Sequence, residues 1–275
     1  MRTPGAPSLR GRGRAGRHLD GLTSDWRRLA ADDPLWAVCV APGRQSGGWD
    51  AEDLYALGRR EVEDSLARAA ALGLEVGRGE ALDFGCGVGR LSLALADRVE
   101  HVVGVDIAPE MVAHARRRAG DRTDVEFVVN DRPDLSLFED GRFRLVFTSL
   151  VLQHLPASLA ASYLCEMGRV LAPGGVLVAH APDRPTWSLR GQAFRWLPGP
   201  VTRQVQRRLL GYPAPMRMTM LPGARVRATL AGAGVQVVAS DPERRYGGYW
   251  HELRHYGVRL PASPAGQAPG RNAGS

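Results

Sequence analysis

Short apolar runs alternate with longer amphipathic stretches through the middle of the chain. The runs at residues 80–84, 101–106 and 125–129 have the length and apolar content of strands that are covered on both faces. Similar runs follow at 143–149, 176–181 and 235–240, with a last one near 255–260. The stretches between them, such as 157–171, favour helices. This alternation at βαβ spacing predicts an α/β fold, in which a mostly parallel sheet has helices on both faces.

The N-terminal part predicts helices that precede the first strand. Apolar side chains recur on one helical face within 20–31, and Asp50 is placed to cap a long helix that ends at Leu72. Because these helices come before the strand at 80–84, they can lie across the mouth of a site at the end of that strand. We therefore expect an N-terminal helical extension over 19–75.

Residues 183–222 interrupt the alternation of strands and helices. The stretch is rich in Arg, Pro, Trp and Met and holds one amphipathic piece, at 201–210. We expect a cap insertion over the substrate. Its apolar side chains form either a satellite core or a lid for a bulky acceptor; they are Trp187, Phe194, Trp196, Met216, Met218 and Met220.

The composition sets the expected boundaries. Residues 1–18 and 261–275 are dominated by small, polar and Arg residues, so we expect disordered tails around a single domain at 19–260. The net charge is +7, but five arginines precede Asp20 and one lies in the C-terminal tail, which leaves about +1 for the rest. A basic face for nucleic acid is therefore not expected.

The chain shows neither a secretory signal pattern nor an apolar run long enough for a membrane helix, so a cytoplasmic protein without membrane insertion is expected. Its three cysteines, Cys39, Cys86 and Cys165, are widely spaced and suggest neither a zinc ribbon nor a disulfide framework. The sequence does not indicate an oligomeric state.

A glycine-rich turn follows the first strand and predicts a nucleotide site. A dinucleotide fold asks for G-x-G-x-x-G, whereas here Gly85, Gly87 and Gly89 come at every second position and Arg90 stands where the third Gly would be. Asp106, at the end of the second strand, can accept hydrogen bonds from ribose hydroxyls in either kind of site. An acid beside the turn, Asp83, would repel a pyrophosphate but suits a ligand with an ammonium group. S-adenosylmethionine (SAM) is thus favoured over NAD.

The same stretches resemble the motifs of the class I SAM-dependent methyltransferases, most of all the small-molecule type. "LDFGCGVGR", "VVGVDIAPEMV", "VEFVVNDRPDL", "FRLVFTSLVLQHL" and "RVLAPGGVLV" follow one another in the family's order. The resemblance implies a Rossmann-like, seven-stranded mixed sheet of order 3-2-1-4-5-7-6 with the last strand antiparallel. It also implies SAM as cofactor, S-adenosylhomocysteine as product, no metal, and methyl transfer to O, N or C of a small-molecule acceptor such as a natural product. One departure is Arg144, where the family has Asp.

Roles follow from the resemblance position by position. Asp83 would meet the methionine ammonium directly or through water, Asp106 the ribose, and Ile107 the adenine ring. Asp131 would read the adenine amino group. The complete expected cofactor set is Asp83, Gly85, Cys86, Gly87, Gly89, Arg90, Asp106, Ile107, Met111, Asn130, Asp131, Arg132 and Ser149. For Cys86 an unreactive small side chain, and for Met111 a core position, are the competing interpretations.

His154 is the candidate catalytic residue. It follows the fourth strand at the end where ligands bind in such sheets, and a neutral imidazole there can take a proton from the acceptor. The competing interpretation is a His that caps a helix or bonds a backbone carbonyl. His251–His255 spells H-E-x-x-H, but that zinc signature needs a helix, and this stretch is expected in the last hairpin.

Other functions stay open at this point. "TSLVLQH" replaces the Asn/Asp-Pro-Pro-aromatic run that is usual for N-methylation of bases, which disfavours a nucleic-acid methyltransferase. A protein methyltransferase and a SAM-binding protein without catalysis are further alternatives.

Overall fold

A seven-stranded sheet forms the centre of the molecule. The computed structural model describes residues 14–41, 43–186, 199–208, 211–243 and 250–261. The strands are β1 Glu80–Phe84, β2 His101–Asp106, β3 Val125–Val129, β4 Phe143–Thr148, β5 Leu171–Pro185, β6 Val235–Glu243 and β7 Trp250–Arg259. Their order is β3-β2-β1-β4-β5-β7-β6, and β7 runs antiparallel to both neighbours while the other pairs are parallel. The predicted order and the antiparallel last strand are confirmed.

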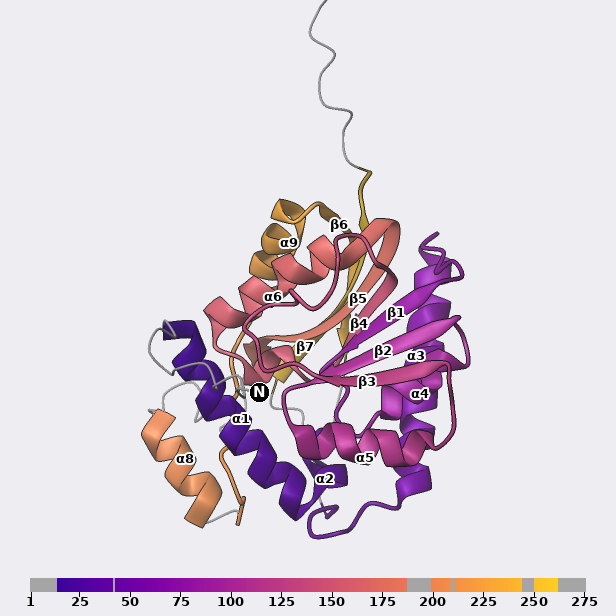
Figure 1. Ribbon diagram of the computed structural model, residues 1–275. Helices are drawn as coiled ribbons and strands as arrows, with labels where there is room; N and C mark the ends of the chain where they lie inside the picture. Colours follow the sequence, from indigo (N-terminus) through magenta and orange to yellow (C-terminus); the bar gives the residue numbers. More distant parts are fainter. Residues whose placement is uncertain (1–13, 42, 187–198, 209–210, 244–249, 262–275) are drawn as a thin grey trace, which may run out of the picture.

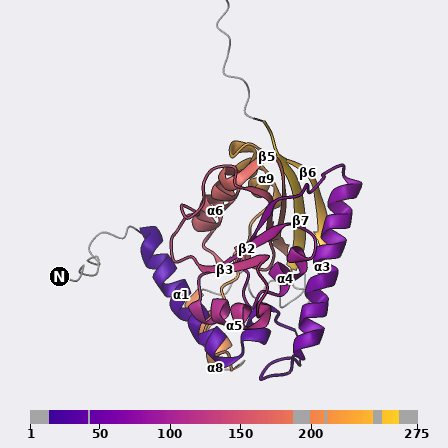
Figure 2. The same ribbon diagram turned by 45° about the vertical axis from the view of Figure 1, so that its right-hand side comes forward.

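Helices cover both faces of this sheet, as Figures 1 and 2 show. One face carries α3, α4 and α5, and the other carries α6 and α9. The helical elements are α1 Arg14–Asp32, α2 Pro34–Val38, α3 Ala51–Ala71, α4 Arg90–Ala96, α5 Pro109–Ala119, the 3-10 turn η1 Leu152–His154, α6 Ala157–Val170, α8 Gly199–Arg208 and α9 Gly223–Gly232. The predicted cap of α3 is present, since Asp50 accepts a hydrogen bond from the Asp53 amide.

The strand pattern explains the two core layers. Successive residues of a strand point to opposite faces, so Leu82 and Phe84 join the layer under α6 while Ala81 joins the layer under α3 and α4. Both layers are buried, which is why the strands read as nearly continuous apolar runs.

A third apolar cluster forms where the N-terminal helices meet the segment that precedes α9. Trp36 of α2 and Tyr55 of α3 are buried there together with Met216. The Trp36 and Tyr212 rings pack edge to face with centroids 4.8 Å apart. Residues 212–216 therefore pack on the N-terminal helical extension.

Several boundaries differ from the sequence predictions. Helix α1 begins at Arg14, so residues 14–18 are helical although the sequence predicted disorder over 1–18. Strand β5 continues to Pro185 instead of ending at 181, and β7 begins at Trp250 instead of near 255. The two strands extend each other, because Arg184 pairs with His251 and Pro185 with Trp250. Such pairing between distant segments leaves no local pattern. Of the predicted tail at 261–275, residues 262–275 lie outside the described residues.

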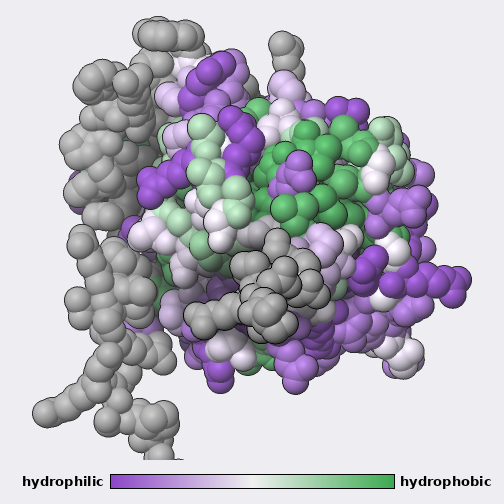
Figure 3. Space-filling view, turned by 90° about the horizontal axis from the view of Figure 1, so that it is seen from above, coloured by the Kyte–Doolittle hydropathy of each residue, from purple (hydrophilic) through white to green (hydrophobic). Residues whose placement is uncertain are grey.

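Figure 3 views the molecule from the top of Figure 1 and shows apolar residues gathered over part of that face, with polar side chains around them. Among the described residues no helix combines the length and the apolar character that a membrane span needs.

Candidate active site

The glycine turn after β1 is held in a shape that only glycine adopts easily. Gly85, Gly87 and Gly89 have φ of 77°, 53° and 82°. A Cβ on Gly85 would lie 2.2 Å from Val151 Cγ2, and one on Gly87 would lie 2.4 Å from Val38 Cγ1. The turn is anchored to β2, because the amides of Gly85 and Cys86 both donate to the Val105 carbonyl at 2.8 and 2.9 Å. The backbone of the turn is therefore packed closely from both sides.

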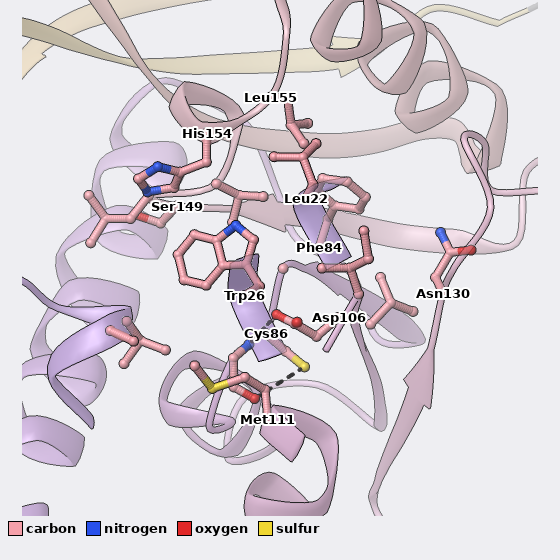
Figure 4. Close-up of a pocket in the computed structure, with 18 of the residues that line it drawn as sticks. Leu22, Trp26, Phe84, Cys86, Asp106, Met111, Asn130, Ser149, His154 and Leu155 are labelled. Atoms are coloured by element: carbon pink, nitrogen blue, oxygen red, sulfur yellow. Dashed lines mark hydrogen bonds between the residues drawn. The ribbon is translucent and has the colours of Figure 1, made fainter. Parts of the chain in front are cut away.

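A cavity that is open to solvent lies against this turn at the carboxyl ends of β1, β2 and β4 (Figure 4). Helices α1 and α2 close it from the other side. Ten of the predicted site residues line it: Gly85, Cys86, Gly87, Arg90, Asp106, Ile107, Met111, Asn130, Ser149 and His154. The rest of the wall is mostly apolar, including Leu22, Trp26 and Leu155. Sequence positions up to 144 residues apart, from Leu19 to Tyr163, thus meet in one space.

Asp106 is fixed by two backbone donors. Its Oδ2 accepts from the Gly87 amide at 3.0 Å, and its Oδ1 accepts from the Ala108 amide at 2.9 Å. Burial raises the pKa of this carboxyl, while the amide bonds oppose the rise. Each carboxylate oxygen accepts about two hydrogen bonds, so both retain capacity for a hydroxyl group in the cavity. This arrangement fits a ribose.

His154 lies in η1 with its ring in the cavity wall. Its Nδ1 is 2.7 Å from the Arg217 carbonyl oxygen. A carbonyl only accepts, so Nδ1 carries the proton and Nε2 keeps its lone pair. Burial lowers the pKa of this imidazole to about 4. The Trp26 indole packs edge-on against the ring, with centroids 5.0 Å apart. His154 thus lies in the cavity, as a base role requires, and it also bonds a backbone carbonyl, as the competing interpretation expected.

The loop between β4 and η1 has an unusual backbone. Leu150 has a φ of 62°, a left-handed conformation that is uncommon for a branched apolar residue. Its amide donates to Nδ1 of the buried His180 at 3.4 Å. This loop carries Ser149, Val151 and His154 into the cavity, so the strain is located at the site itself.

Comparisons with known proteins agree with this geometry. Residues 81–175 match the family model described as a methyltransferase domain. A ubiquinone biosynthesis O-methyltransferase of Xanthomonas campestris pv. campestris is 35% identical over 141 residues, which cover 50% of this chain and 56% of that protein. A 2-heptyl-1-hydroxyquinolin-4(1H)-one methyltransferase of Mycobacteroides abscessus is 36% identical over 108 residues, 38% of this chain and 47% of that protein. The chain therefore spans about half the length of these curated relatives.

Among solved structures, magnesium protoporphyrin IX methyltransferase from Synechocystis PCC 6803 with bound S-adenosylhomocysteine has the same fold. The TM-score is 0.55 at 20% identity, over 86% of this chain and 93% of that one. Residues 81–175 of this chain thus match a methyltransferase domain, and the chain shares its fold with a solved methyltransferase.

Four predicted residues of the methyltransferase domain do not line the cavity, and Asp83 is one of them. Strand alternation turns it toward α4, where its Oδ2 accepts from Ser92 Oγ at 2.6 Å, while its buried Oδ1 has no hydrogen-bond partner among the described residues. Burial raises the pKa of Asp83 to about 7. Direct contact with a methionine ammonium is thus not supported by the structure, and a role through water stays a prediction.

The other three are Gly89, Asp131 and Arg132. Gly89 belongs to the glycine turn but does not line the cavity, and neither Asp131 nor Arg132 lines it. Asn130 closes a small turn after β3 by accepting from the Arg132 amide at 3.2 Å, which directs the exposed Asp131 to a shallow surface depression beside α1. The carbonyl of Arg132 accepts from Tyr163 Oη at 2.5 Å. In this arrangement Asn130, rather than Asp131, lies in the wall of the cavity.

The other residues that the sequence singled out are Cys86, Arg144 and the run His251–His255. Cys86 lines the cofactor cavity, and burial raises the pKa of its thiol well above the ordinary value. Arg144, near the start of β4, packs over Gly77 and Gly79 and donates to the Pro173 carbonyl, away from the glycine turn. His251–His255 lies in strand β7, as expected, and the described residues hold no group of three or more His, Cys, Asp or Glu that could bind a metal ion.

The cap insertion contributes to the site through residues 216–221. The Thr219 amide donates to the Gln153 carbonyl at 2.7 Å, next to the bond between Arg217 and His154. Met216 is buried and belongs to the third cluster, which favours the satellite core for this part of the cap. Trp187, Phe194 and Trp196 lie outside the described residues.

Residues that sequence reasoning missed come mainly from the N-terminal helices. Leu22 and Trp26 of α1 line the cavity, and Glu61 of α3 binds two of its wall residues, Arg90 and Ser149. The apolar face of α1 was visible in the sequence, but the element that it would cover was not. Glu61 stands among many charged residues of α3, so nothing local marks it.

Proposed function

We propose that this protein is a SAM-dependent methyltransferase that acts on a small, largely apolar acceptor with an acidic hydroxyl group. The observation that carries the proposal is one cavity whose wall holds both the Asp106 carboxylate, behind a glycine turn, and the neutral ring of His154. The family match and the fold support the class of reaction. The whole reaction is inferred, since the relatives align over only part of their length.

The residues present fit SAM. Asp106 suits the ribose hydroxyls, and Ile107 and Met111 offer apolar surface beside it for the adenine ring. The glycine turn brings bare backbone to the cavity, which allows the methionyl part to approach. When bound, SAM supplies an electrophilic methyl group on a positively charged sulfur.

The residues of the chain itself orient the acceptor and accept the proton of its hydroxyl group. Leu22, Trp26 and Leu155 share the cavity with His154 and exclude water around an apolar ring. Nε2 of His154 makes no hydrogen bond within the described part of the chain, and the Arg217 carbonyl keeps the ring in the tautomer that can accept a proton there. With a pKa of about 4 the ring is a weak base that stays neutral near pH 7. A weak base suits a phenol or enol better than an aliphatic alcohol.

The names of the two curated relatives are consistent with such an acceptor, since one is an O-methyltransferase of ubiquinone biosynthesis and the other acts on a hydroxyquinolinone. We also propose a cytoplasmic location, which is supported by three cysteines that form no disulfide within the described part of the chain. The acceptor itself is identified only by its chemistry.

The cofactor is tested first. Calorimetry of the full chain with S-adenosylhomocysteine should show binding, and NADH should give no heat of binding. Binding of NADH without S-adenosylhomocysteine would overturn the assignment.

The acceptor class is tested by incubating the protein with methyl-labelled SAM, a cell extract, and a panel of hydroxylated quinones and quinolinones. Label in small organic products supports the proposal. Label confined to precipitated protein or nucleic acid would replace it with a macromolecular methyltransferase, and binding without any transfer would favour a non-catalytic protein.

The base is tested with His154→Asn. The Asn amide can still donate to the Arg217 carbonyl in place of Nδ1, but it offers no group at the position of Nε2. Turnover should fall by roughly a hundredfold or more while affinity for S-adenosylhomocysteine stays near that of the wild type. Unchanged turnover would remove His154 as the base.

A further inference from the structure

A buried group of charges stands behind the wall of the cofactor cavity. Glu61 of α3 accepts from Arg90 at 2.9 Å through Oε2, and from Ser149 at 2.5 Å and Arg254 at 2.9 Å through Oε1. The side chains of Arg90, Arg254 and Glu61 are only 6%, 6% and 11% exposed. Glu243 completes the group with two bonds to Arg254, at 2.8 and 2.9 Å.

This group separates two cavities. Arg90 and Ser149 line the cofactor cavity, whereas Glu61, Arg254 and Glu243 line a second, open cavity between α3 and the ends of β6 and β7. Arg90 lines both. Glu61 therefore reaches the cofactor cavity through Arg90 and Ser149.

Arg90 lines the cofactor cavity and has N–H donors beyond the one that binds Glu61. Its Nη1 donates one hydrogen bond to Glu61, and the other N–H groups of the guanidinium make no hydrogen bond within the described part of the chain. A guanidinium keeps its charge at every pH of interest and binds carboxylates with paired N–H groups. The anionic group of SAM is the carboxylate of its methionyl part, which the glycine turn beside Arg90 is shaped to receive.

We propose that Glu61 is a positioning residue, which holds Arg90 and Ser149 in place so that Arg90 binds the methionyl carboxylate. This inference rests on the proposed function. Glu61 fixes one edge of the Arg90 guanidinium and leaves its remaining donors for the ligand. It also fixes Ser149. One carboxylate from the N-terminal extension therefore holds two residues of the cavity wall, Arg90 and Ser149, in place.

The hydrogen-bond network allows the positioning role of Glu61 to be measured separately from its contribution to the stability of the fold. Arg254 keeps two bonds to Glu243 when Glu61 loses its charge, so the cost of Glu61→Gln falls mainly on Arg90 and Ser149. The amide keeps the size of the side chain and one acceptor oxygen, which allows the fold to persist.

The test compares two ligands that differ in the methionyl part. S-adenosylhomocysteine carries the carboxylate, and 5′-methylthioadenosine lacks both the carboxylate and the ammonium. For Glu61→Gln, calorimetry should show about tenfold weaker binding of S-adenosylhomocysteine and unchanged binding of 5′-methylthioadenosine. Glu61→Asp, which keeps the charge but shortens the reach, should lower the same ratio of affinities by a smaller factor.

The matched control is Glu63→Gln. Glu63 lies on the same helix, 62% exposed, in a 3.4 Å pair with Arg98, so both affinities should equal those of the wild type. Equal weakening of both ligands by Glu61→Gln and Glu61→Asp, or no weakening of either, would overturn the inference. Failure of the wild-type protein to bind S-adenosylhomocysteine would instead overturn the proposed function.

Discussion

His154 makes the stability of the fold depend on acid in a way that can be calculated. Its imidazole ordinarily titrates at 6.5, and burial lowers its pKa in the folded protein to about 4. As the pH falls through 6.5, the unfolded chain takes up this proton first, so the folded state loses stability between pH 6.5 and pH 4. Above pH 6.5 the residue is neutral in both states and contributes no pH dependence.

The size of the effect follows from the two pKa values. At pH 5 the unfolded chain is almost fully protonated at this site and the folded protein about one-tenth protonated, which gives a loss of about 2 kcal/mol relative to pH 8. The full loss, reached below pH 4, is about 3 kcal/mol. For a domain whose total stability is roughly 5–15 kcal/mol, such a loss is large enough to measure.

The perturbation is His154→Asn, which keeps a donor for the Arg217 carbonyl and removes the titrating ring. Urea unfolding at pH 5 and pH 8 measures the change in stability of the wild type and of the variant. The wild type should lose about 2 kcal/mol more than the variant over this interval. Comparing the wild type with the variant over the same pH interval cancels the contribution of other buried imidazoles, such as that of His255, whose pKa burial also lowers to about 4.

The control is His251→Asn, because His251 is exposed on β7 and its replacement should leave the wild-type dependence in place. If His154→Asn and the wild type lose the same stability between pH 8 and pH 5, the ring is not held neutral by burial. The reasoning about the tautomer and the base would then fail with it.

Three further predictions concern the turn, a helix contact and the thiols. Asp106→Ala should weaken S-adenosylhomocysteine binding by about a hundredfold in calorimetry, since it removes two charge-assisted hydrogen bonds to the ribose; less than a threefold change would contradict the assignment. Gly58→Ala places a Cβ 2.5 Å from the Arg90 carbonyl oxygen, so a cost of about 1–3 kcal/mol for overpacking should outweigh a gain of about 1 kcal/mol in helix propensity. Gly21→Ala in α1, where a Cβ meets nothing within 4 Å, should instead stabilise by up to about 1 kcal/mol in the same urea assay. A thiol reagent should modify Cys165 quickly in the folded protein and leave the buried Cys39 and Cys86 unmodified until unfolding; rapid loss of all three thiols would show that the turn opens.

The cofactor half of the site was largely readable from the sequence because its residues are close together in the chain. The turn at Gly85–Gly89 follows directly from β1, and Asp106 ends the adjacent strand, so their meeting is set by one βαβ unit. The sequence did not indicate the side-chain directions within such units. Asp83 turns toward Ser92 because of strand alternation, and Asp131 is directed outward by the turn that Asn130 closes.

The sequence by itself thus determined the order of strands and helices, the glycine turn and the acid that lines the cavity at the end of β2, because these depend on local periodicity and on short connections. The tertiary structure alone decided what surrounds the acceptor. Trp26 reaches His154 from α1, Arg217 fixes the ring of His154 from the cap, and Glu61 reaches Arg90 from α3. These contacts join segments 29 to 128 residues apart, and contacts of that kind arise only when whole elements pack. The spacing of residues along the chain therefore does not predict these contacts.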